Sequence, residues 1–87
     1  MITAQQLRAA RALLRLDQRA LAAASGLSLP TIQRMESSDG VVRGNVDSLT
    51  KLIEALDRAG IELIGEGAAS AGGGRGVRLK HAAGAPG

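Results

Sequence analysis

The chain of 87 residues contains no Cys, Phe, Trp or Tyr and only one His. Without cysteine it forms neither a disulfide nor a thiolate metal site, and His81 alone cannot supply a metal cluster or a catalytic triad. Without aromatic rings it lacks the stacking surfaces with which many proteins bind RNA and single strands. The glycine-rich segments 65–67 and 72–74 lack the Gly-Lys-Ser/Thr ending of a phosphate loop. We therefore expect no catalytic residues, no metal, no cofactor and no enzymatic activity.

Long apolar runs are absent as well. A transmembrane helix needs about 18 consecutive apolar residues, and the N-terminus lacks the charged and then apolar pattern of a signal peptide. The sequence therefore predicts a cytoplasmic protein without a membrane partner.

The core must be built from Leu, Ile, Val, Ala and Met, which favours closely packed helices. A chain of this length forms one small domain and buries about two thirds of its unfolded surface, which leaves little room for an enclosed active site. Residues 1–44 carry six arginines against three acidic residues, a balance of +3. Residues 45–66 have a net charge of −3 and residues 67–87 of +3. A surface that binds polyanions is therefore expected in the first block or the last.

Four segments are predicted to be helices: 3–15, 18–25, 29–37 and 46–59. The first opens with the capping-box pair Thr3 and Gln6, and the others follow the N-cap residues Asp17, Ser28 and Asn45. Short strands are predicted at 61–64 and 76–80, joined by a mobile glycine-rich loop over 65–76 and followed by a disordered tail, 81–87. We expect a helical domain over 1–60 and a β extension over 61–80.

Residues 18–37 carry the pattern of a helix-turn-helix, two short helices joined by a turn at Gly26. Ala22 is small where the second helix crosses the first, and Gly26 permits the positive φ of a sharp turn. Three larger apolar residues should hold the angle between the helices: Leu21, Ile32 and Met35. In this motif the second helix enters the major groove of DNA.

The stretches LRAARALLRL and QRALAAASGLSLPTIQRME are typical of the Cro/phage-repressor helix-turn-helix family, also called the xenobiotic-response-element family, which residues 5–60 resemble. The resemblance implies a mainly α, compact four-helix fold like that of lambda repressor, and a DNA-binding regulator of transcription. It also implies an ion pair between Arg11 on the first helix and Glu36 at the end of the recognition helix. The ending AGIELI…GVRLK is similar to that of small bacterial members with a β extension, although Leu63 stands where an aromatic residue is usual.

The recognition helix, 29–37, should turn four residues outward toward base edges: Leu29, Pro30, Gln33 and Arg34. Glutamine suits adenine and arginine suits guanine, while Leu29 and Pro30 suit thymine methyl groups. The alternative for Leu29 is a capping contact. Contacts to the DNA backbone are expected from five others: Gln18, Arg19, Ser28, Thr31 and Arg43. By resemblance, Gln18 binds a phosphate or braces a neighbouring side chain.

A lone unit of this kind binds DNA weakly, so we expect a homodimer with recognition helices about 34 Å apart, in successive major grooves. The two strands are predicted to pair across a two-fold axis into a shared sheet through five apolar residues: Ile61, Leu63, Ile64, Val77 and Leu79. The alternative is an intrachain hairpin packed on the fourth helix.

The leading hypothesis is a sequence-specific, double-stranded-DNA-binding regulator, a repressor that acts on an inverted repeat in the nucleoid. The first alternative is an antitoxin that wraps a protein toxin and also regulates its own gene by binding DNA. The second is a protein-interaction adaptor, which would show no salt-dependent affinity for random duplex DNA.

Overall fold

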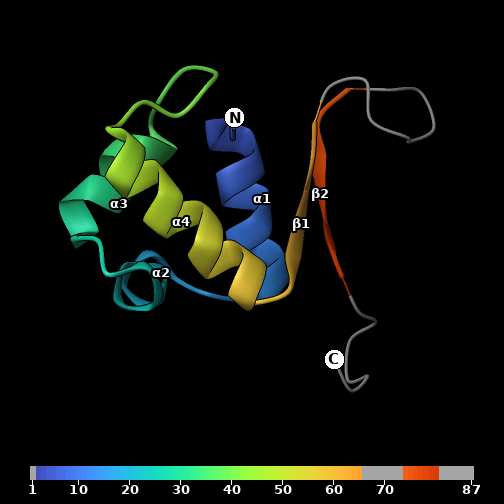
Figure 1. Cartoon of the computed structure of the whole chain (residues 1–87), viewed down its shortest axis with the longest axis horizontal. Coiled ribbons are helices and arrows are strands. Elements are labelled where there is room, and N and C mark those ends of the chain that lie inside the picture. The colour runs from blue at the N-terminus through green and yellow to red at the C-terminus, as the bar shows by residue number, and fades with distance from the viewer. Residues whose placement is uncertain (1, 66–73, 81–87) are drawn as a thin grey trace.

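The computed structural model describes residues 2–65 and 74–80, which form four helices and a two-stranded sheet (Figure 1). The elements in chain order are α1 (Ala4–Leu14), α2 (Gln18–Ser25), α3 (Leu29–Glu36), α4 (Val46–Arg58), β1 (Ile61–Ile64) and β2 (Gly76–Leu79). The mainly α architecture and the order of the elements agree with the prediction. Most of the glycine-rich loop and all of the predicted tail, 81–87, lie outside the described residues.

Each helix begins where a side chain caps it. Thr3 Oγ1 accepts a hydrogen bond from the N–H of Gln6 at 3.1 Å, and Gln6 Oε1 accepts one from the N–H of Thr3 at 2.9 Å, which completes the predicted capping box. Asp17, Ser28 and Asn45 accept from N–H groups three residues further on, at 2.7, 3.2 and 2.7 Å. These bonds satisfy donors that the first turn of a helix leaves without a partner.

Two residues with positive φ set the turns between the first three helices. Gly26 ends α2 with φ 75°, as predicted. Arg15 ends α1 with φ 57°, a left-handed conformation that costs a residue with a Cβ about 1–2 kcal/mol. The N–H groups of Arg15 and Leu16 bond to carbonyls in the last turn of α1. The helix therefore ends one residue before the predicted boundary.

The core contains only aliphatic residues and methionine. Its largest fully buried side chains are Ile2, Leu7, Leu21, Ile32, Met35, Val42, Leu52 and Leu56. Figure 1 shows α1 between α3 on one side and the β-hairpin on the other, and α1 contacts both. Complete burial of one such side chain contributes about 1.5–3 kcal/mol. This shared core therefore holds α3 in a defined position relative to the hairpin.

The strands β1 and β2 pair with each other in antiparallel register, with Ile61 opposite Leu79 and Leu63 opposite Val77. The intrachain hairpin, which was the alternative, is therefore the arrangement that forms, and the predicted pairing of these two strands across a two-fold axis is corrected. Ile61 is 2% exposed and belongs to the core of its own chain. The part expected of Ile61 at a dimer interface stays a prediction.

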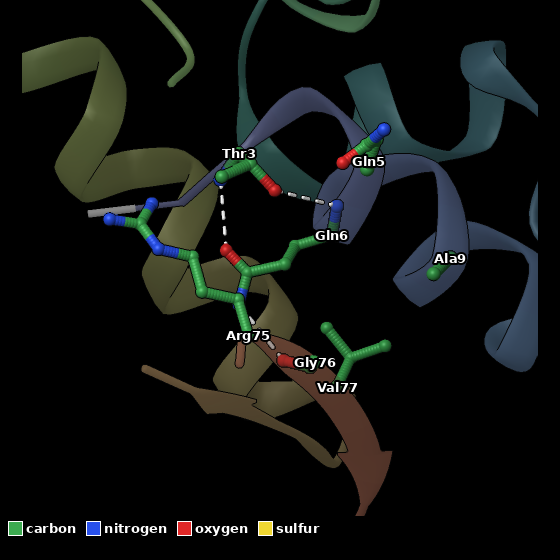
Figure 2. A pocket seen from close by; sticks show the side chains of 7 residues that line it. All are labelled: Thr3, Gln5, Gln6, Ala9, Arg75, Gly76 and Val77. Atoms are coloured by element: carbon green, nitrogen blue, oxygen red, sulfur yellow. Dashed lines mark hydrogen bonds between the residues drawn. The ribbon is translucent and has the colours of Figure 1, made fainter. Parts of the chain in front are cut away.

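The hairpin forms because α1 anchors both of its strands. The side chains of Leu63, Val77 and Leu79 pack against the core, so Leu63 replaces the usual aromatic residue in the packing. Gln6 Nε2 donates to the carbonyl oxygens of Ile64 at 3.0 Å and Gly76 at 2.9 Å; Figure 2 shows Gln6 beside Gly76. The hairpin consequently rests on α1 as well as on α4.

Candidate DNA-binding surface

The helices α2 and α3 meet at the turn around Gly26 and pack through their apolar faces. Leu21, Ile32 and Met35 are buried as predicted, with exposed fractions of 1% or less. Ala22 is also buried, because a small side chain suits a close crossing of two helices. The arrangement leaves the opposite side of α3 free to face a ligand.

The outer side of α3 consists of exposed residues. Pro30, Gln33 and Arg34 are exposed, as predicted, whereas Leu29 is half-buried. The side chains of Gln33 and Arg34 have no hydrogen-bond or ion-pair partner among the residues that the structure describes. Their donors and acceptors are therefore free to pair with a molecule from outside.

The first turns of α2 and α3 lie side by side around an open depression of about 240 Å³. Its lining brings together four of the predicted contact residues with one acidic residue: Gln18, Arg19, Leu29, Gln33 and Asp17. At the start of α3, the hydroxyl groups of Ser28 and Thr31 are 2.8 Å apart and hydrogen-bonded to each other. Ser28 is thus a cap first, and its hydroxyl stays exposed beside the N-terminus of α3.

A buried carboxylate connects the three helices around this surface. Glu36, with a side chain 5% exposed, accepts from Arg11 Nε at 2.8 Å and from Arg11 Nη2 at 3.1 Å. The expected ion pair is therefore present, and the hydrogen bond to Glu36 raises the pKa of the Arg11 guanidinium above its ordinary value. Gln18 Nε2 donates to the same carboxylate at 3.2 Å. Of its two expected roles, bracing a neighbour is the one that Gln18 has here.

The comparison with known families decides the identity of this arrangement. A family model described as helix-turn-helix matches residues 7–63, from α1 to β1. The chain belongs to the Cro/C1-type helix-turn-helix family. No curated protein matches the chain.

A Cro/C1-type helix-turn-helix domain is a DNA-binding regulator, and its family is generally non-enzymatic. In this Cro/C1-type chain, α3 is the second helix of the motif and therefore the recognition helix. No helix within residues 2–65 and 74–80 combines the length and apolar character that a bilayer span requires.

Two arginines of this Cro/C1-type domain lie where the sequence alone did not indicate. One makes a bond that was not predicted, and the other lies apart from the remaining predicted contact residues. Arg8 is exposed, and its Nη1 donates to the backbone carbonyl of Glu36. Arg8 and Arg11 are three residues apart on one helix, and this spacing is the signal that they share a target. Arg43 is exposed in the segment between α3 and α4 and does not line the depression.

Proposed function

We propose that this Cro/C1-type protein is a sequence-specific repressor that binds an inverted repeat as a homodimer, with α3 in the major groove. The observation that carries the proposal is the pair Gln33 and Arg34, whose side chains are exposed and have no partner within the described residues. They lie on a helix held by the buried carboxylate of Glu36. A rigid helix with free polar side chains suits the reading of base edges, because little order is lost on binding.

Each exposed residue of α3 has a chemical role in this proposal. Arg34 donates two hydrogen bonds to a guanine edge, and Gln33 pairs with an adenine. Pro30 and the half-buried Leu29 contact thymine methyl groups.

Contacts to phosphates position α3 in the groove. Ser28 and Thr31 lie at its N-terminus, where free N–H groups and the helix dipole favour an anion. Arg19 borders the same depression, and Arg43 contacts the backbone from the segment after α3. Gln18 reaches a phosphate only if its amide leaves or shares Glu36.

Dimerisation follows from the geometry of duplex DNA. Two recognition helices related by a two-fold axis fit successive major grooves about 34 Å apart, and this is why such sites are inverted repeats. The hairpin β1–β2 supplies the interface because it lies on the far side of α1 from α3 (Figure 1). The protein would work on the chromosome, in the nucleoid. The antitoxin alternative stays a prediction, and co-purification of a toxin would establish it.

The experiment begins with selection of bound sites from a random duplex pool, followed by titration of fluorescently labelled duplexes. We expect Arg34→Ala to weaken the selected site by about 1–3 kcal/mol and to relax the preference at one base pair. Arg19→Ala is the matched comparison, because a phosphate contact weakens all sequences alike and lowers the salt slope by about 1. If Arg34→Ala weakens selected and random duplexes equally, Arg34 does not read a base.

A further inference from the structure

At the outer edge of β2, some backbone groups have no backbone partner among the described residues. In an antiparallel pair, the bonded positions alternate along each strand. The N–H of Lys80 donates to the carbonyl of Gly60 at 2.7 Å, which fixes the phase of this alternation. The N–H and C=O groups of Val77 and Leu79 therefore point away from β1, and none of them bonds to another backbone group among the described residues. Such an edge is a template for a further strand.

A groove runs beside this edge. It has a volume of about 340 Å³, and its lining comes from α1 and from β2: Thr3, Gln5, Gln6, Ala9, Arg75, Gly76 and Val77. Figure 2 shows Val77 pointing toward the side of α1 that carries Ala9. The edge of β2 therefore has open space next to it.

The side of α1 that borders the groove is uncharged, although the helix carries two arginines elsewhere. We call this side the open face of α1; it consists of the exposed residues Gln5, Ala9, Ala12 and Leu13. Leu13 is 43% exposed and is one of the few large apolar side chains at the surface. The small residues around it allow a second helix to approach closely.

We propose that the occupant of this surface is a second copy of the chain, which adds its own β2 to the edge and lays the open face of its α1 against that of the first. The proposal rests on the homodimer of the proposed function and names its interface. Two hairpins joined in this way make a four-stranded sheet, which is more stable in water than a two-stranded one.

The charges on β2 select the register of the two copies. Residues whose backbone groups point outward must pair with each other across the two copies, which allows three registers. In the first, Val77 lies opposite Val77 of the second copy. In the other two, Leu79 of one copy lies opposite Leu79 or Val77 of the other. The last two registers place Arg78 beside Arg78 or Lys80 of the second copy, and like charges opposite each other destabilise a sheet. The first places Arg78 beside Gly76, which has no side chain. The two-fold axis therefore passes through Val77.

An axis at Val77 also places Ala9 close to its own copy, because Val77 and Ala9 line the same groove. This self-facing position permits a sharp test with three variants of the full chain. Ala9→Glu and Ala9→Lys each place like charges across the axis, whereas a mixture of the two places opposite charges there. Ala9 is exposed, so both variants should fold, and circular dichroism checks this.

We expect the unmodified chain to be dimeric in sedimentation equilibrium. Each variant alone should dimerise at least about tenfold more weakly, because like charges at an interface are strongly unfavourable, and the equimolar mixture should recover the dimer. Ala23→Glu, at an exposed position on α2, is the control and should dimerise as the unmodified chain does. A monomeric unmodified chain, variants that dimerise normally, or a mixture without recovery would each overturn the proposal.

Binding to a duplex with a single half-site separates this proposal from the function on which it rests. Half-site binding by a chain that fails the dimer test would overturn only the interface. A dimer that passes the test but binds no duplex would overturn the DNA-binding function and leave the interface standing.

Discussion

Removal of the Arg11 side chain should destabilise the domain more than any other single loss of charge described above. The Arg11→Ala variant leaves Glu36 with a side chain 5% exposed and with one remaining side-chain donor, Gln18 at 3.2 Å. A buried carboxylate cannot recover its hydration without opening the junction of α1, α2 and α3. The loss of Arg11 Nη1, which donates to the carbonyl of Leu16 at 3.1 Å, adds to the effect.

The magnitude follows from the unequal burial of the two partners. Loss of one partner from a buried pair costs roughly 3–5 kcal/mol. Because the Arg11 side chain is 26% exposed and Gln18 stays near the carboxylate, we expect a value near the lower end, about 3 kcal/mol. Glu36→Gln leaves Arg11 able to turn to water and keeps a neutral acceptor, so it should cost less, about 1–2 kcal/mol. The order of the two variants matters more than either value.

Denaturant unfolding followed by far-ultraviolet circular dichroism measures these free energies, since the chain has no aromatic residue for fluorescence. For a domain of this size, about 3 kcal/mol corresponds to a fall in Tm of roughly 12–24 °C. Arg19→Ala is the control, because Arg19 is exposed and has no partner within the described residues. If Arg11→Ala lowers the unfolding free energy no more than Arg19→Ala does, the pair contributes nothing to stability.

Two further predictions concern the hairpin. Gln6→Ala removes three side-chain hydrogen bonds at about 1 kcal/mol each and should speed amide exchange in β1 and β2 more than in α3. The control is Gln33→Ala, at an exposed position on α3, which should leave exchange in the hairpin unchanged. The hydrogen bonds from Arg78 lower the pKa of the Glu62 carboxyl from its ordinary 4.5. The pair therefore stabilises the hairpin above that pH, and its contribution is lost as the pH falls through the lower folded-state pKa. An NMR titration of Arg78→Ala should find the pKa of Glu62 raised toward its ordinary value; an unchanged, low pKa would contradict this cause.

The helices could be predicted from the sequence because their signals are local. Thr3, Asp17, Ser28 and Asn45 each cap a helix through an N–H three residues away. The end of α1 was harder to predict from the sequence, because Arg15 adopts a left-handed conformation that is normally signalled by a glycine. The partner of each strand could not be predicted, since the alternation of apolar residues shows which face of a strand is buried but not which strand lies beside it.

Some features of the candidate site could likewise be predicted from the sequence, and others could not. Helical spacing places Gln33 and Arg34 outside and Ile32 inside, and the ion pair between Arg11 and Glu36 came from the resemblance to a family. The bonds that Arg8 and Gln6 make to backbone carbonyls had no such signal. A carbonyl acceptor is present at every residue, so its choice depends on the tertiary fold alone.

The two bonds of Gln6 to the hairpin also bear on the order of folding. They close stretches of 58 and 70 residues, whereas the bonds of Glu36 to Arg11 and Gln18 close 25 and 18. A contact that closes a longer loop of the chain costs more conformational entropy, so it forms later in folding. The helices should therefore assemble first, and the hairpin should dock last. The reverse order on unfolding would release the edge of β2 while α3 is still in place. Mild denaturation would thus yield a folded monomer that still recognises a half-site, and dimer exchange would proceed through it.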